Sequence, residues 1–228
     1  MTFDRDNPAT WWGFNPLIIA HDVGRSRDRS TAVVGGNSTF QPRLTGMTEF
    51  IELPQGLYGS ARASALAQVD RRQENNALIV ADLSNDASYA EVLYETFGRR
   101  VIGLQISRHG DGMQFERRPV RNSAMPVYTI GRTYLLNLFH DELNASQIRM
   151  VDNDMSRKAF AQLAELETEQ RETGIVYKCP AGRHDDLGMS CAMLAWAARH
   201  PHLSNWVNFI RPRTTRVRTQ QYGWAAFT

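Results

Sequence analysis

Ala77-Leu78-Ile79-Val80-Ala81-Asp82 is a nearly continuous apolar run that ends on an acidic residue. Such a run is typical of a β-strand that is buried on both faces of a sheet. Residues 87–97 contain helix formers and stop at Gly98, and residues 101–106 form another apolar run. A strand, a helix and a strand at this spacing predict one crossover unit with two parallel strands. The sequence therefore predicts an α/β fold.

A second apolar run, Leu17-Ile18-Ile19-Ala20, ends at His21-Asp22 in the same way. The polar loop 24–30 follows it, and residues 31–36 indicate a strand, so the two strands are expected to form a hairpin. Further strands are expected at 50–53, 148–151 and 175–178, and a loop or hairpin at 108–126. Helices are expected at 60–74, 130–143, 156–169 and 185–199, with Ser156 as the cap of the third.

A third acidic position lies in His184-Asp185-Asp186-Leu187, which opens an apolar run that continues to Ala198. Two adjacent carboxylates at the start of a core helix are costly unless a cation or a partner meets them. One of them could cap the helix, and successive helical residues point about 100° apart, so only one is expected to face a site. We favour Asp186 for that role, with Asp185 as the alternative. His184 is expected either to orient a carboxylate or a water, or to lie on the surface.

The acidic positions indicate one chemistry if the fold brings them together. Taken alone, Asp22 or Asp82 is more often a turn residue or a cap than a ligand. Together with the 185–186 pair they would bind divalent ions, because Mg²⁺ and Mn²⁺ prefer oxygen ligands. Two such ions about 3.5–4 Å apart suit phosphodiester hydrolysis, and Asp28 could assist. No zinc site is indicated by the spacing of the four remaining histidines, His109, His140, His200 and His202.

The chain has 228 residues, a hydrophobic content of 42% and a formal net charge of +2. We expect a main domain over 17–200, an irregular segment over 1–16 and a tail over 201–228. No apolar run approaches the roughly 20 residues that a membrane span needs, so no membrane association is expected. The N-terminus is unlike a secretory signal, and the two cysteines, Cys179 and Cys191, suit a reducing compartment. We therefore expect a cytoplasmic protein.

Basic residues gather at three places in the sequence, and nearly all of them are arginine. Such clusters can follow a phosphate backbone, although a solvated surface explains any one of them equally well. The candidates for contact with DNA are Arg25, Arg27 and Arg29 after Asp22, Arg117, Arg118 and Arg121 in the middle of the chain, and Arg211 and Arg213 near the C-terminus.

The order of these segments resembles the nuclease domain of tailed-phage large terminases, in the ribonuclease H-like superfamily. The similar pieces are the 77–104 segment around Asp82, Gly131-Arg132-Thr133-Tyr134-Leu135-Leu136 followed by Ile148-Arg149-Met150-Val151, and Gly182-Arg183-His184-Asp185-Asp186-Leu187. The resemblance implies a mixed central sheet flanked by helices.

By this resemblance, Asp22, Asp82 and Asp186 (or Asp185) are ligands of two Mg²⁺ or Mn²⁺ ions, with assistance from Asp28. The family implies an endonuclease that cuts concatemeric double-stranded viral DNA during packaging in a bacterial host. The sequence contains no Walker-type ATP-binding loop. A separate packaging ATPase is therefore expected as a partner, together with a small terminase subunit and a portal.

Two other functions are compatible with these observations. One is a different ribonuclease H-like nuclease, such as a junction resolvase or a transposase core, for which the sequence shows no clear basic arm or partner domain. The other is a non-catalytic domain of the same fold that binds DNA or a packaging partner. The intact acidic residues argue against this last function.

Overall fold

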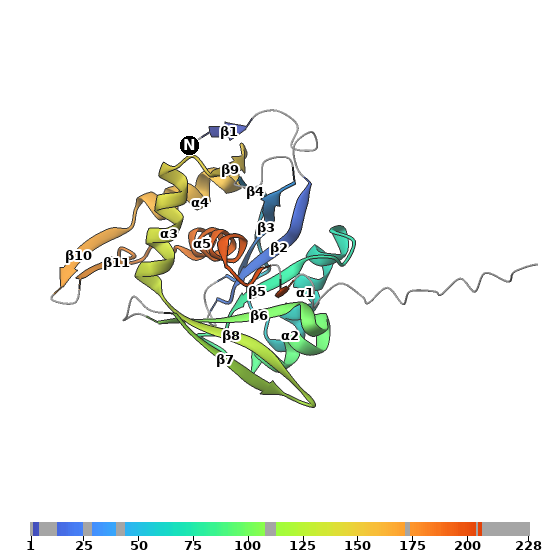
Figure 1. Ribbon diagram of the computed structural model, residues 1–228. Coiled ribbons are helices and arrows are strands. Elements are labelled where there is room, and N and C mark those ends of the chain that lie inside the picture. The colour runs from blue at the N-terminus through green and yellow to red at the C-terminus, as the bar shows by residue number, and fades with distance from the viewer. Residues whose placement is uncertain are drawn as a thin grey trace, which may run out of the picture.

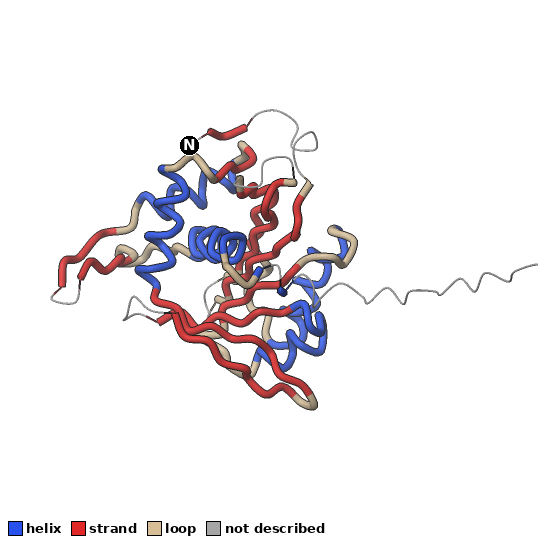
Figure 2. The backbone as a smooth tube through the Cα atoms, in the orientation of Figure 1, coloured by secondary structure: helices blue, strands red, loops and turns tan. Residues whose placement is uncertain are grey.

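Nine strands form one mixed sheet in the computed structural model, which describes residues 2–4, 13–24, 29–39, 44–107, 113–171, 174–203 and 205–206. Their order across the sheet is β1-β9-β4-β3-β2-β5-β6-β8-β7, and helices cover both faces (Figure 1). Figure 2 shows these strands as one band with helices on either side. The strands are β1 (Thr2–Asp4), β2 (Phe14–Asp22), β3 (Thr31–Ser38), β4 (Thr45–Glu52), β5 (Leu78–Asp82), β6 (Val101–Ser107), β7 (Met113–Val120), β8 (Ser123–Gly131) and β9 (Ile148–Val151).

The described residues also form five α-helices and a small separate hairpin. The helices are α1 (Gly59–Arg72), α2 (Tyr89–Phe97), α3 (Arg132–Asn144), α4 (Asp154–Ala164) and α5 (Asp186–Arg199), and the 3₁₀ turn η2 (Gly98–Arg100) follows α2. The hairpin pairs β10 (Glu167–Arg171) with β11 (Gly174–Lys178) and projects from the body of the domain (Figure 1). None of the helices in this part of the chain is long and apolar enough to span a membrane.

The centre of the sheet confirms the pairings that the sequence predicts. β2 and β3 form an antiparallel hairpin. β5 and β6 pair in parallel, and α2 lies in the connection between them. β2 also pairs in parallel with β5, so the carboxyl ends of these two strands meet at one edge of the sheet. The fold is therefore the mixed α/β sheet flanked by helices that the sequence leads us to expect.

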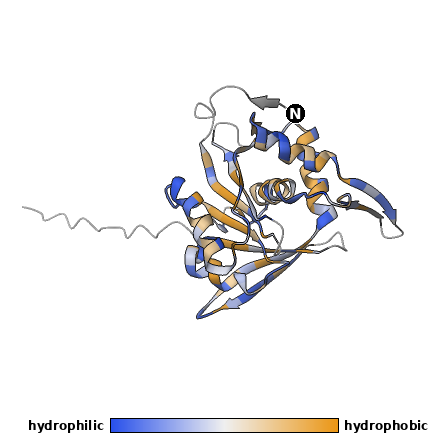
Figure 3. Ribbon diagram, turned by 180° about the vertical axis from the view of Figure 1, so that it is seen from behind, coloured by the Kyte–Doolittle hydropathy of each residue, from blue (hydrophilic) through white to orange (hydrophobic). Residues whose placement is uncertain are grey.

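Helix α5 lies in the middle of one layer and is buried from Leu187 to Ala198. It packs against β2 and β3 on one side and against α3 and α4 on the other, while α1 and α2 cover the opposite face of the sheet (Figure 1). A helix enclosed by protein is apolar all round, as the orange colour of α5 in Figure 3 shows. Gly188 permits close contact with α4, because a Cβ atom there would lie 2.8 Å from Leu163 Cγ.

Helix α4 differs from its expected bounds at both ends. It begins at Asp154 because Asn153 is the N-cap, whose side chain accepts a hydrogen bond from the Ser156 backbone N–H at 2.8 Å. Ser156 was expected as the cap, but it is the third helical residue and completes a capping box with Asn153. The helix ends at Ala164, and β10 occupies residues that were expected to be helical.

Several other segments also differ from, or refine, what the sequence leads us to expect. β2 begins at Phe14 and β4 at Thr45, so both strands are longer than expected, and the segment 1–16 is not irregular throughout. The alternative of a hairpin within 108–126 is confirmed by the antiparallel pair β7 and β8. Beyond α5, the His200 ring stacks on Trp206 with 4.4 Å between the ring centroids, so the start of the expected tail packs on the domain.

Candidate active site

Asp22 and Asp82 lie side by side at the carboxyl edge of the sheet. The register pairs His21 with Ala81, so Asp22 and Asp82 are the next residues on two neighbouring parallel strands. Both are buried, with exposed fractions of 9% and 5%. In open α/β sheets, ligands bind outside the carboxyl ends of the strands, so this edge is where a site is expected.

A chain of hydrogen bonds connects Asp22 to the start of α5. The backbone N–H of Asp22 donates to the Ser190 hydroxyl at 3.3 Å, and that hydroxyl contacts the Thr31 hydroxyl at 2.8 Å. Thr31 Oγ1 donates in turn to the carbonyl oxygen of Asp186 at 2.9 Å. Since these groups come from β2, β3 and α5, they hold Asp22 and Asp186 at the same end of the sheet.

Asp82 takes part in a turn and also faces the site edge. The Ser84 backbone N–H and hydroxyl both donate to Asp82 Oδ1, at 2.8 and 2.5 Å. The backbone bond is the Asx turn that the sequence allows as an alternative role for Asp82. At the start of α2, Asp86 accepts bonds from the Ser88 hydroxyl and from the N–H of Tyr89, the first helical residue, whereas the N-cap residue Ser88 makes no side-chain capping bond.

The two adjacent acids at the start of α5 have different surroundings. α5 begins at Asp186, and Asp185 occupies the N-cap position without a side-chain capping bond. The Asp185 carboxylate instead forms an ion pair with Arg132, the first residue of α3. The two side chains are only 14% and 21% exposed. A cation therefore meets one of the two carboxylates at this helix start, that of Asp185.

The charges of three other carboxylates act on Asp22. Burial raises the pKa of Asp22 well above its usual value, and the charges of Asp82, Asp186 and Asp185 raise it further. Burial also raises the pKa of Asp82, although hydrogen bonds to its carboxylate oppose the rise. Arg132 acts against both shifts. The charges of Asp82, Asp185 and Asp186 thus act on Asp22, and we call these four side chains the acidic cluster.

Arg132 is one of the residues of this site that sequence reasoning missed. Its partner Asp185 is 53 positions away in the chain, and no local pattern connects the two. Thr31 and Ser190 were missed for the same reason, because hydroxyls on a strand and on a helix carry no sequence signal until the fold brings them together. The only available hint was the cost of two adjacent buried carboxylates, which requires a cation but does not identify it.

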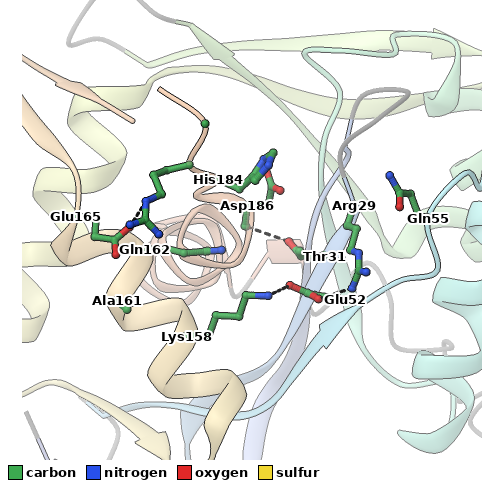
Figure 4. A pocket seen from close by; sticks show the side chains of 12 residues that line it. Arg29, Thr31, Glu52, Gln55, Lys158, Ala161, Gln162, Glu165, His184 and Asp186 are labelled. Atoms are coloured by element: carbon green, nitrogen blue, oxygen red, sulfur yellow. Dashed lines mark hydrogen bonds and ion pairs between the residues drawn. The ribbon is translucent and has the colours of Figure 1, made fainter. Parts of the chain in front are cut away.

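A pocket of about 540 Å³ opens beside Asp186, between the end of β4, helix α4 and the segment 182–186 (Figure 4). His184 is exposed and lines this pocket, so it lies near one acid of the cluster, as its expected assisting role needs. The lining residues are Arg29, Thr31, Glu52, Gln55, Lys158, Ala161, Gln162, Glu165, Gly182, Arg183, His184 and Asp186.

The arginines expected to contact DNA are spread over the molecule. Arg29 lines the pocket and pairs with Glu52 at 2.8 Å. Arg117 and Arg118 lie on the edge strand β7, Arg121 follows in the turn to β8, and none of these three lines the pocket. The remaining candidates, Arg25, Arg27, Arg211, Arg213 and the acid Asp28, lie outside the described residues.

The donor groups of the acidic cluster suit a hard divalent cation. All are carboxylate oxygens, the ligands that Mg²⁺ and Mn²⁺ prefer, and buried like charges favour the arrival of positive charge. Across the described ranges, no three Asp, Glu, His or Cys side chains are grouped as ligands of one ion. In this arrangement the Arg132 guanidinium supplies the positive charge beside Asp185.

Comparison with known proteins gives no match by sequence. No protein-family model matches the chain. No curated protein matches it either.

Solved structures, in contrast, match the fold over most of the chain. The large terminase nuclease from the thermophilic phage G20c with bound magnesium has a TM-score of 0.53 at 16% identity, covering 80% of this chain and 82% of that chain. The same nuclease with bound cobalt has a TM-score of 0.52 at 17% identity, covering 80% of this chain and 82% of that chain. The large terminase nuclease domain of Thermus phage P74-26 has a TM-score of 0.50 at 15% identity, covering 81% of each chain.

The mixed sheet, with buried acids at the carboxyl ends of β2 and β5, defines a ribonuclease H-like α/β fold. Within that class, the chain has the fold of the nuclease domains of phage large terminases.

Proposed function

We propose that this chain is a divalent-metal-dependent endonuclease that hydrolyses phosphodiester bonds of double-stranded DNA. The acidic cluster is the observation that carries the proposal. The buried carboxylates that end β2 and β5 lie at one edge of the sheet, and the half-buried acids at the start of α5 act on Asp22 there. Their mutual repulsion favours the binding of a cation there. The fold shared with phage large terminase nucleases supports the same reaction.

Asp22, Asp82 and Asp186 are the proposed ligands of Mg²⁺ or Mn²⁺. Asp186 is preferred over Asp185 because Asp185 is engaged by Arg132, whereas Asp186 lines the pocket. When bound, a pair of such ions would neutralise charge on the attacking and leaving oxygens and lower the pKa of the attacking water.

The chain's own residues position these ligands. The Thr31 and Ser190 hydroxyls fix the start of α5 relative to Asp22, and the Ser84 bonds fix one oxygen of Asp82. His184 is proposed to orient a water at the mouth of the pocket, and Asp28 to assist Asp22.

The proposed substrate is the concatemeric double-stranded genome of a phage, cut at the start and end of packaging in the cytoplasm of the bacterial host. The chain would then act with a separate packaging ATPase, a small terminase subunit and a portal. The similarity in fold to two phage large terminase nucleases supports this role.

Conversion of supercoiled plasmid to nicked and linear DNA tests the nuclease proposal, with Mn²⁺ or Mg²⁺ compared against excess EDTA. Asp22→Asn and Asp82→Asn remove a charge with almost no change of volume and should abolish cutting. Asp154→Asn is the matched control, because the Asp154 side chain is fully exposed at the start of α4, and it should cut like the wild type. Cutting that persists in EDTA, or in both site variants, contradicts the proposal.

Other substrates separate the alternatives within the same fold. A strong preference for four-way junctions over linear duplex would indicate a junction resolvase. Binding of duplex DNA without cutting in either metal would indicate a non-catalytic domain.

A further inference from the structure

The pocket beside Asp186 carries two cations that share one carboxylate. Lys158 from α4 and Arg29, which precedes β3, pair with Glu52 at the end of β4, at 2.5 and 2.8 Å. Figure 4 shows the two side chains reaching this carboxylate from opposite sides. Glu52 is 17% exposed, whereas Lys158 and Arg29 are 48% and 57% exposed, so both cations remain accessible to a ligand.

Among these three side chains, the two cations exceed the one carboxylate by a single positive charge. Of the other charged lining residues, Arg183 pairs with Glu165 at 3.7 Å, and Asp186 adds one negative charge. Burial by itself would raise the pKa of Glu52, but hydrogen bonds and charge from Lys158 and Arg29 outweigh burial and lower it. Glu52 therefore stays ionised at neutral pH and holds both cations in place. Side chains that are already ordered lose less conformational freedom when a ligand binds, so Lys158 and Arg29 are organised to contact an anion.

The remaining lining favours a nucleic-acid backbone over a base. None of the described residues that line the pocket is Phe, Tyr or Trp, and proteins that hold unpaired bases usually stack them on such side chains. Two amides, Gln55 and Gln162, line the pocket instead, and Gln162 is oriented by a 3.1 Å bond from the Gly188 N–H to its Oε1. Amides and cations are the groups that contact phosphate and sugar oxygens.

We propose that this pocket binds the sugar–phosphate backbone of the DNA strand beside the cleaved bond, with Lys158 and Arg29 contacting phosphate. The inference rests on the proposed nuclease function, because Asp186 belongs both to the pocket and to the acidic cluster. Contacts of this kind position the strand without reading its sequence, so cutting should show little sequence preference on this side of the bond.

Binding of a fluorescent DNA duplex in EDTA, followed by anisotropy at several salt concentrations, tests the pocket without cutting. Lys158→Ala should weaken binding and reduce the slope of log K against log salt by about 0.9, the value for one phosphate contact. Arg29→Ala should do the same, and Lys158→Arg should keep the wild-type slope. Arg157→Ala is the matched control, because Arg157 is the preceding residue on α4, is 58% exposed, pairs with Asp152 and does not line the pocket.

Glu52→Gln gives a test of opposite sign. It removes the shared carboxylate, leaves both cations, and should tighten DNA binding. If Lys158, Arg29 and Glu52 only stabilise the fold, Glu52→Gln and Lys158→Ala should both lower the melting temperature and leave the salt slope unchanged. That result would overturn the inference.

The plasmid assay distinguishes a failure of this inference from a failure of the nuclease proposal. Suppose that the wild type cuts plasmid, and that Lys158→Ala and Arg29→Ala bind DNA with the wild-type salt slope. This result overturns the inference about the pocket and leaves the nuclease proposal intact. Suppose instead that both variants lower the salt slope, and that the wild type cuts with neither metal. This result supports the pocket as a DNA-binding site and contradicts the nuclease proposal.

Discussion

Arg132 and Asp185 form an ion pair between the first residue of α3 and the N-cap position of α5. The pair brings a guanidinium to the acidic cluster, where it acts against the rise in the pKa of Asp22 and Asp82. The fold thus contains its own counter-cation for a group of carboxylates that repel one another. Changes to the cluster should therefore affect stability in a direction that depends on which charge is removed.

Asp22→Asn should raise thermal stability in EDTA while it abolishes cutting. The pKa of Asp22 is higher in the folded protein than in the unfolded chain, so folding is favoured as the pH falls and the ionised carboxylate opposes folding at neutral pH. Removal of this charge should raise the melting temperature by about 2–6 °C, measured by scanning calorimetry.

Two comparisons make the Asp22→Asn result specific. The exposed control Asp154→Asn should change the melting temperature much less. Addition of Mn²⁺ should raise the melting temperature of the wild type, because a ligand that binds only the folded state stabilises it, and should have little effect on the variant. A lower melting temperature in Asp22→Asn would mean that this carboxylate stabilises the fold.

Arg132→Met should have the opposite effect on stability. The variant leaves the acidic cluster without its cation, and the free energy of unfolding should fall by about 1–3 kcal/mol, between the values for exposed and fully buried ion pairs. The loss should be larger at about pH 8 than at about pH 5, because protonation of the raised-pKa acids relieves the repulsion. Urea unfolding at both pH values measures it, with Arg157→Met as control. Equal losses at both pH values would indicate a packing effect alone.

The sequence could predict which acids end the buried strands but not how the fold pairs these strands or which cation lies beside the acids. The apolar runs before Asp22 and Asp82 indicate buried strands that each end on an acid. The parallel pairing of β2 with β5, which places these two acids side by side, is a finding of the structure. The Arg132–Asp185 contact depends on how α3 and α5 pack. A charged residue in the sequence does not show which residue of opposite charge it will pair with in the fold. The same limit applies to Lys158, which on α4 looks like any exposed helical lysine.

Local signals also failed where two residues compete for one role or where a segment is polar. Asn153 and Ser156 are both good capping residues, so the start of α4 was placed at the wrong one. The β10 segment, Glu167–Arg171, has no apolar alternation, and it forms a strand because β11 pairs with it. A two-stranded hairpin outside the main sheet does not need a buried face and so leaves little trace in the sequence.

Asp186→Asn should reduce Mn²⁺ affinity and cutting much more than Asp185→Asn does. Asp185 is engaged by Arg132, so its variant should lose stability and show a decrease in activity of roughly 10–100-fold, as is typical for residues that orient ligands. Asp186→Asn should remove a ligand and cut no faster than Asp22→Asn. Calorimetric titration with Mn²⁺ and the plasmid assay rank the two variants. The reverse order would assign the metal to Asp185 and the supporting role to Asp186.

His21 lies next to Asp22 on β2 and faces the opposite side of the sheet, toward Tyr89. Its Nδ1–H donates to the Thr31 carbonyl oxygen at 2.8 Å, and its Nε2 has no hydrogen-bond partner among the described residues. Burial lowers the pKa of His21 to about 4, although the Thr31 bond opposes this shift. A proton on Nε2 would have no acceptor, so the folded protein holds the neutral ring.

Stability should therefore decline in mild acid because of His21. Its pKa is lower in the folded protein than in the unfolded chain, so the unfolded chain binds the extra proton between about pH 6.5 and about pH 4, and stability is lost as the pH falls through this window. The loss can reach about 3 kcal/mol, at up to about 1.4 kcal/mol per pH unit. Asn at position 21 can still donate to the Thr31 carbonyl but cannot take up a proton. The difference in unfolding free energy between wild type and His21→Asn, measured in urea across this window, should therefore shrink as the pH falls. A constant difference would show that the His21 ring is protonated equally in both states, and so is not held neutral by the fold.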